Sequence, residues 1–244
     1  YYYELNTTKP PFNDPRVRRA LNMGLDKDII ADKVMGQGQR PAWLISQPDI
    51  GGVTLKQPDY ASWPRDKRIA EAKKLLNEAG FNESHPLVFN LLYNTSETHQ
   101  RIAIAASSMW KKNLGVEAKL QNQEWKTMLD TMHTHNFDAV RYAWIADYDD
   151  AASFLNNFRT GDSENTSQYS NPAYDKALHD AAKAADTAAR GKFYQQAEDL
   201  LAEDVPAIPV YHYVRTHLVK PWVGGFEPDK LGYYYTKDMY IIKH

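Results

Sequence analysis

The sequence predicts an α/β fold in which helices pack on a central mixed β-sheet. Residues 87–93 form an almost continuous apolar run, which is typical of a strand covered on both faces. A polar turn, a helix ending at Leu114-Gly115 and a second strand at 116–121 follow. Such a β-α-β unit makes its two strands parallel, with a right-handed crossover. A strand at 137–145, rich in Val, Tyr and Trp, extends the sheet.

Local start and stop signals predict the elements of the first quarter. Residues 1–9 predict a Tyr-rich strand that ends at two prolines. Asp14 followed by Pro15 predicts a helix start, because Asp caps free N–H groups and proline has none to lose. A second short helix is expected from 26 to 34. It ends at the Gly-Gln-Gly of 36–38, which is no dinucleotide loop because it does not follow a strand.

The next stretch begins with a long loop. Residues 39–64 contain four prolines and show no sustained periodicity. A loop of this length in a compact protein is often functional. Residues 65–79 then form an amphipathic helix, which Gly80 should end in a left-handed conformation. Residues 124–134 predict a further helix that leads into the strand at 137–145.

The last part of the chain alternates helices with one more strand. The expected elements are a short helix from 151, a helix from Asn171-Pro172 to about 185, a helix capped by Thr187 that runs to 203, and a strand at 208–214. A loop-rich end begins at Gly224-Gly225.

Composition excludes several classes of protein. A hydrophobic content of 43% and a charged content of 25% indicate a globular chain that is neither disordered nor membrane-embedded. The net charge of −2 provides no basic surface for nucleic acid. The chain has no cysteine, so disulfides, thiolate nucleophiles and cysteine metal sites are excluded together.

The stretch 136–154 is the strongest candidate for a ligand site. The strand at 137–145 is followed directly by Asp147, with Trp144 and Tyr148 beside it. Open α/β sheets bind ligands just past the ends of their strands. The alternative is that Asp147 and the nearby aspartates form an ordinary solvated turn that caps a helix.

Catalytic and metal-binding patterns are weak. His133 and His135 are two residues apart and do not share a helical face, and no HExxH motif is present, so no metal is expected. The absence of GxSxG argues against a serine hydrolase. Asp147 is close in sequence to Asp149 and Asp150, whereas a glycosidase pair lies across a sugar ring.

Several segments resemble a known family. They include YNTSETH, NQEWKT, YAWIADYDDAASFLNN, VPAIPVYHYV and LVKPWVGGF. The chain resembles the periplasmic oligopeptide-binding proteins of bacterial ABC importers and the closely related murein-peptide-binding proteins. The resemblance runs from Tyr1 to His244 and corresponds to the C-terminal half of the family's chain.

The resemblance implies a periplasmic binding protein-like (type II) lobe. Residues 1–218 would form the C-terminal, peptide-binding lobe, and residues 1–6 would cross the hinge and belong structurally to the other lobe. Residues 219–244 would be a tail that packs on the N-terminal lobe. The chain is therefore expected to be an excised C-terminal lobe, without signal peptide or N-terminal lobe.

The resemblance also implies the ligand-contacting residues. Asp147 would pair with the free α-amino group of a peptide. Peptide-backbone contacts and a pocket wall would come from Arg141, Tyr142, Ala143 and Trp144. The pocket would be lined by Trp125, Asn94, His99 and Tyr213. Met132 and Ile145 differ from the arginine and cysteine that relatives often carry there.

The function that follows is peptide transport. The chain would be part of the solute-binding component that delivers oligopeptides in the periplasm to the membrane permease subunits of an ABC transporter. It would be no enzyme and would need no cofactor. The alternatives are murein tripeptide binding for cell-wall peptide recycling, a hydrolase acting on peptides or glycans, and a purely structural interaction module.

Overall fold

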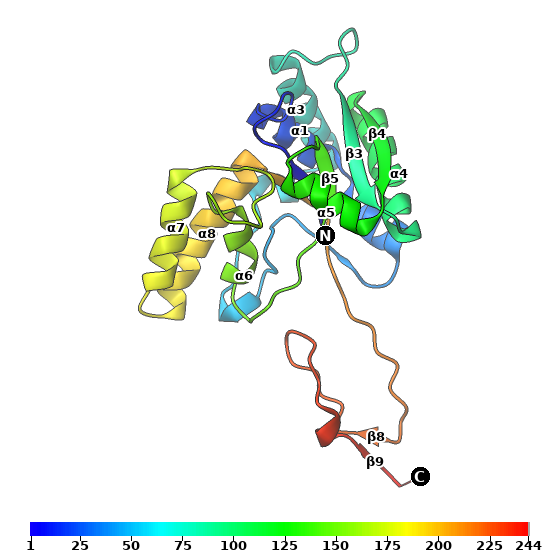
Figure 1. Cartoon of the computed structure of the whole chain (residues 1–244), viewed down its shortest axis with the longest axis vertical. Coiled ribbons are helices and arrows are strands. Elements are labelled where there is room, and N and C mark those ends of the chain that lie inside the picture. The colour runs from blue at the N-terminus through cyan, green and yellow to red at the C-terminus, as the bar shows by residue number, and fades with distance from the viewer. Residues whose placement is uncertain (244) are drawn as a thin grey trace.

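The computed structural model describes residues 1–243 and confirms the α/β prediction. Within these residues the largest sheet has five strands in the order β4-β3-β5-β1-β6 (Figure 1). The strands are β1 Tyr2–Leu5, β3 Val88–Asn94, β4 Glu117–Gln123, β5 Ala139–Tyr142 and β6 Ala207–Pro209. Strand β3 is parallel to β4 and β5, whereas β1 is antiparallel to β5 and β6, so the sheet is mixed.

The β-α-β unit forms as predicted. Helix α4, Glu97–Leu114, joins β3 to the parallel strand β4. The hydroxyl of Ser96 accepts a hydrogen bond from the His99 N–H, which caps the start of the helix. Gly115 ends it with φ of 74°, a left-handed conformation that favours glycine.

One face of the sheet packs on three helices. Tyr3 and Leu5 of β1 and Phe89 and Leu91 of β3 point to this face, as the period of two along a strand requires. The covering helices are α1 Pro15–Gly24, α3 Arg65–Glu78 and α4. Trp110 of α4 is fully buried there, and its indole N–H donates to the Leu21 carbonyl at 2.9 Å.

The opposite face is covered in two parts. Helix α5, Trp125–His133, packs over Leu92 and Val140. Helices α6 Ala152–Leu155, α7 Pro172–Lys183 and α8 Thr187–Asp204 cover the side near Tyr2 and Ala207. Figure 1 shows α7 and α8 lying side by side beyond the edge of the sheet. Strands β1, β3, β5 and β6 are therefore covered on both faces, as the apolar run at 87–93 predicted, whereas the edge strand β4 is largely exposed.

Three predicted strands are shorter than expected, and the first of them, predicted at 1–9, forms only from Tyr2 to Leu5. The strand predicted at 137–145 pairs only from 139 to 142, so the residues leading to Asp147 are irregular. The strand predicted at 208–214 divides into β6 and β7, Tyr211–His212. Strand β7 pairs with β2, Arg40–Pro41, in a separate small sheet. The change of sheet comes at Val210, whose N–H still donates to the Tyr1 carbonyl at 2.9 Å while its own carbonyl accepts from the Ala42 N–H, next to β2, at 3.1 Å.

The caps of two helices were predicted with different success. Asp14 caps α1 as expected, accepting from the Arg16 N–H at 2.9 Å. Helix α8 is capped by Asp186 and not by Thr187, because the Asp186 carboxylate accepts from the Ala189 N–H at 2.7 Å. Thr187 is instead the first helical residue.

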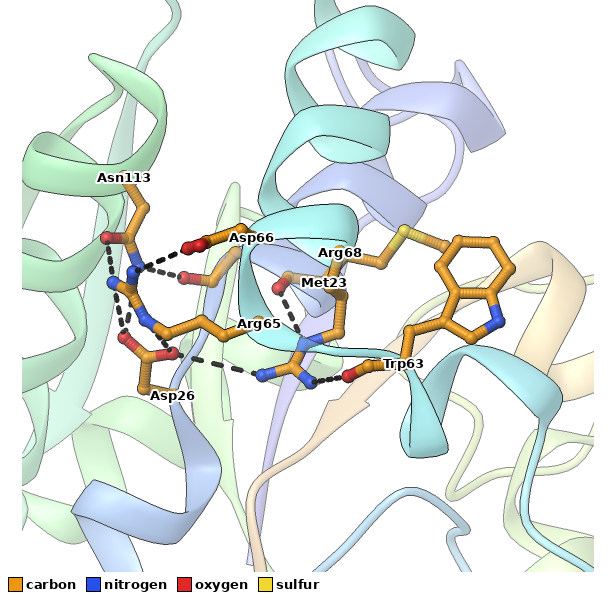
Figure 2. Close-up of polar contacts among 8 residues, drawn as sticks. Met23, Asp26, Trp63, Arg65, Asp66, Arg68 and Asn113 are labelled. Carbon is orange, nitrogen blue, oxygen red and sulfur yellow. Dashed lines mark hydrogen bonds and ion pairs between the residues drawn. The ribbon is translucent and has the colours of Figure 1, made fainter.

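The predicted helix at 26–34 forms as α2, Lys27–Ile29, continued by a π-helix to Met35. The Asp26 carboxylate does not cap it. Figure 2 shows that it pairs with Arg65 (Nε–Oδ1 2.9 Å) and lies 3.8 Å from Arg68, while Arg65 also donates to Asn113. This cluster joins the α1–α2 connection to α3 and α4, so Asp26 has a structural role.

The two ends of the chain are placed differently from each other. Residues 1–6 are buried, and β1 pairs with β5 on one side and β6 on the other within this sheet. The C-terminal arm, which we define as residues 213–243, extends away from the sheet (Figure 1). Its strands β8 Val223–Gly224 and β9 Tyr240–Ile241 pair with each other. The division into a lobe of 1–218 and a tail remains a prediction.

Candidate functional site

Most of the predicted site residues gather at one edge of the sheet. Asn94 ends β3, and Arg141 and Tyr142 end β5, which is parallel to β3. His99 lies in the first turn of α4, which follows β3, and Trp125 begins α5, which follows β4. The carboxyl ends of parallel strands are where open α/β sheets bind ligands. The predicted edge is therefore assembled from three strands.

Arg141 is the central charge of this edge. Its side chain is buried, and the guanidinium donates to Asn94 Oδ1 at 3.2 Å and to the Tyr213 hydroxyl at 2.8 Å. It also lies 4.7 Å from the centre of the Tyr1 ring. Within residues 1–243 no carboxylate pairs with it, and its Nε has no hydrogen-bond acceptor. A buried cation without an acidic partner is costly, so this guanidinium is suited to an anionic ligand group.

His99 lies beside Arg141 and is neutral at pH 7. Burial, and to a smaller extent the charge of Arg141, lowers the pKa of the imidazole to about 4. Its Nδ1 is buried without a hydrogen-bond partner. His99 therefore adds a polar group to the edge but leaves Arg141 as its positive charge.

Tyr142 lies on the opposite face of β5 from Arg141 because side chains alternate along a strand. Its ring stacks on Trp125, with ring centres 6.2 Å apart and planes 9° from parallel. Trp125 remains 41% exposed, so the pair presents a flat aromatic surface to solvent. Ala143, which follows β5, is half-buried.

The three aspartates after β5 have three different environments. Asp150 is fixed: it accepts from Arg190 at 2.9 Å, from the Tyr194 hydroxyl and from the Ala152 N–H. It ties α8 to the start of α6. Asp150 thus has a structural role, but it is bound to α8 and does not form the solvated helix cap of the alternative interpretation.

Asp149 and Asp147 are less constrained. Asp149 accepts from the Gly51 N–H at 2.8 Å, and its second oxygen lies 3.8 Å from the Lys230 ammonium. Asp147 is exposed; its N–H donates to the Ser153 hydroxyl, whereas its carboxylate has no bond or ion pair within residues 1–243. Asp147 is the aspartate that is free to bind a ligand.

A cavity of about 570 Å³ lies next to this turn, between the body of the lobe and the C-terminal arm. Of the predicted residues, Trp144 and Tyr213 line it, and Arg141 adjoins it through the hydroxyl of Tyr213. Asp147 itself does not line the cavity, although Ala146 and Asp149, on either side of it in the sequence, do. Trp125 and Tyr142 do not line it.

Sequence reasoning missed much of the cavity wall. The missed residues come from the long loop (Arg40, Gln47, Asp49, Ile50) and from two parts of the arm, its start (Arg215, His217) and residues 228–232. The length of the loop at 39–64 was a signal for the first group. The arm carried no signal, because its approach to the cavity is a long-range contact.

Two positions at which the chain departs from the resembled family lie in opposite environments. Met132 is buried beside Leu92 and Val140, so it offers no cation to a ligand. Ile145 is 62% exposed at the rim of the cavity. Within residues 1–243 no cluster of three or more His, Asp or Glu side chains is arranged to hold a metal.

The sequence and fold match a known family. The model described as "Bacterial extracellular solute-binding proteins, family 5 Middle" matches residues 1–166. The chain belongs to this family. It is 52% identical to the periplasmic oligopeptide-binding protein OppA of Escherichia coli, over all of this chain and 45% of that protein. The chain thus spans about half the length of the curated relatives it matches.

Solved structures of family 5 relatives agree with the fold. The Escherichia coli murein tripeptide binding protein MppA superposes with a TM-score of 0.90 at 44% identity, over 100% of this chain and 48% of that one. Haemophilus influenzae OppA in complex with RPPGFSPFR gives 0.89 at 43% identity, over 99% and 48%. The predicted type II binding-protein lobe is confirmed. None of the helices within residues 1–243 has the length and apolar character that crossing a bilayer requires.

Proposed function

We propose that this chain is the part of a periplasmic solute-binding protein that holds one side of an oligopeptide for an ABC importer. The supporting observation is that two charged side chains of opposite sign, both at one edge of the sheet, have no ionic partner. The Asp147 carboxylate is exposed and unpaired, and the Arg141 guanidinium is buried without an acid. A short peptide carries one positive and one negative end, so the two charges complement it.

In this proposal Asp147 binds the α-amino group of the peptide. Arg141 to Trp144 contact its backbone, and the Arg141 guanidinium is available for a ligand carboxylate. Trp125, Asn94, His99 and Tyr213 line side-chain pockets. Water between a ligand side chain and polar groups such as these costs little, so one site tolerates varied side chains.

The rest of the receptor would cover the other side of the ligand. The relatives are about twice as long as this chain, and hinge closure of two lobes around a ligand is a common mode of binding. The permease subunits of the importer would be its partners.

A second candidate function is the binding of murein tripeptides. The observation in its favour is the high similarity to MppA, which is described as a murein tripeptide binding protein. Competition between a simple tripeptide and a murein tripeptide for the full-length receptor distinguishes the two. The simple peptide should bind at least as tightly if the first proposal holds.

The test of the proposal is a two-by-two titration of the full-length receptor. Asp147→Asn keeps the shape of the side chain but removes its charge. We expect it to weaken free-amino tripeptides by at least about tenfold, or ~1.4 kcal/mol. N-acetylated peptides should bind poorly to both proteins. Calorimetry gives the four affinities, and mass spectrometry of the peptides after incubation should find them intact.

Asp66→Asn is the matched control. Its carboxylate is fully exposed on α3 and lies 3.9 Å from Arg65, so the substitution makes the same change in charge away from the site. It should leave all affinities unchanged. Equal weakening of free and acetylated peptides by Asp147→Asn would contradict the amino-group assignment. Shortened peptides would favour the hydrolase.

A further inference from the structure

The C-terminal arm contains a loop that is closed on itself. We call residues 228–232 the arm loop. The Asp229 carboxylate accepts from the N–H groups of Leu231 at 2.9 Å and Tyr233 at 2.8 Å, and the Asp229 N–H donates to the Tyr233 carbonyl at 2.8 Å. These bonds hold the loop in one shape without help from the body.

The arm loop is also held by the chain that leaves the body. Arg215 donates to the Gly232 carbonyl at 3.0 Å. Gly232 has φ of 79°, and a Cβ added there would come within 2.8 Å of the Arg215 guanidinium. The positive φ favours glycine at this position. The loop is therefore pre-formed and not a random excursion of the chain.

The arm loop reaches the body at the turn that carries Asp147. The Lys230 ammonium lies 3.8 Å from Asp149, whose carboxylate is already fixed by the Gly51 N–H. Leu231 packs against the apolar cluster that includes Ile50 and Phe154. Figure 1 shows the loop turned back toward α6 and the adjacent turn.

The charged side chains around the cavity differ in the hydrogen bonds that they already make within the chain. Its three carboxylates, Asp49, Asp149 and Asp229, already accept hydrogen bonds from the chain. Lys230 donates no hydrogen bond within residues 1–243, since 3.8 Å is too long for one, and its side chain is 70% exposed. The N–H donors of the Lys230 ammonium are therefore available to an acidic group of a ligand.

We propose that the arm loop is a wall of the pocket for the first side chain of the ligand, and that Lys230 and Asp149 select the charge of that side chain. This inference rests on the proposed function, in which Asp147 holds the amino end. Asp147 does not line the cavity itself, but Ala146 and Asp149 on either side of it in the sequence do, so the side chain next to the amino group is the one directed to the cavity. Lys230 attracts an acidic side chain and shields Asp149 from a basic one.

The test uses the full-length receptor and three free-amino tripeptides that differ only in a first residue of Glu, Ala or Lys. Lys230→Met should weaken the Glu peptide by about threefold to fivefold, as expected for loss of one exposed ion pair. The Ala peptide should be unaffected. The Lys peptide should bind more tightly, because Asp149 loses its counter-charge. Lys230→Arg should restore the wild-type order.

Lys237→Met is the matched control. Lys237 is on the same arm and is 75% exposed, but it pairs with Asp238 and does not line the cavity. It should change none of the three affinities. If peptides bind and Lys230→Met alters all three equally or not at all, the inference fails while the proposed function stands. If no peptide binds the wild-type receptor, the proposed function fails as well.

Discussion

Large apolar side chains are buried in the body of the lobe, residues 1–212, whereas many in the C-terminal arm are exposed to solvent. In the body, Trp110, Tyr3 and Phe12 are fully buried between the sheet and its helices. In the arm, Tyr235 is 63% exposed and Ile241 is 68% exposed. Both regions are rich in aromatic residues, but only the body has two layers between which to bury them.

The difference shows that the arm is incomplete by itself. A two-stranded hairpin is marginally stable in water, and contiguous exposed apolar side chains mark a surface that meets another one. The arm touches the body at its first residue, Tyr213, which bonds to Arg141, and further along at Lys230 and Leu231. The expectation that the segment from 219 packs on another lobe fits this arrangement and remains a prediction.

The largest expected difference between the two regions is in hydrogen exchange of the 244-residue chain. Amides of β3 open only with the body, at a free energy of about 5–15 kcal/mol, whereas amides of β8 and β9 open at nearly zero. Exchange followed by mass spectrometry should therefore separate the two by several orders of magnitude. Slow exchange at 222–226, comparable to β3, would mean that the arm packs firmly on this lobe.

Truncation of one aromatic residue in each region sharpens the comparison. Trp110→Ala should destabilise the chain by about 3–5 kcal/mol, because it leaves a cavity and removes the bond to Leu21. Tyr235→Ala should change stability by less than about 0.5 kcal/mol. Urea unfolding measures both. A comparable loss from the two substitutions would show that the arm is part of the cooperative unit.

A smaller effect is expected from pH, through a carboxyl group in the body. Burial raises the pKa of Glu198 to about 7, although it accepts from the N–H groups of Ile45 and Ser46. A raised pKa means that the folded state binds the proton more tightly. The resulting stabilisation is present below about pH 4.5 and is lost as pH rises through about 7.

Glu198→Gln removes this dependence. The difference in stability between wild type and Glu198→Gln should therefore shift by roughly 2–3 kcal/mol between pH 5 and pH 8, with wild type losing more. Glu203→Gln, an exposed position on the same helix, is the control and should give a constant difference. A constant difference for Glu198→Gln would place the carboxyl in a wetter environment than the structure gives it.

Local signals in the sequence predicted much of the fold. Asp14 with Pro15, Ser96 with Gly115, and Asn171 all start or end helices where expected. These signals act over one turn of helix, so they are readable without tertiary structure. The parallel pairing of β3 and β4 followed from the helix between them.

The position past a strand end pointed to Asp147 and Trp144, the other ligand-site residues were available only through the family resemblance, and all their environments came from the structure. The sequence did not show which of Asp147, Asp149 and Asp150 are bound to other parts of the chain. Asp150 is bound by Arg190, 40 residues away, and Asp149 by Gly51, 98 residues away. Because no local sequence pattern indicates such partners, the sequence could not show that the Asp147 carboxylate is the one without a bond.

The sequence by itself thus determined the fold class, the family and the edge of the sheet where a ligand site lies, because periodicity, caps and family motifs are local. The tertiary structure alone decided that β1 lies inside the sheet, that Arg141 is buried without an acid, and that the arm loop approaches Asp149. Each of these depends on segments far apart in sequence. Their pairing is set by the packing of the whole lobe.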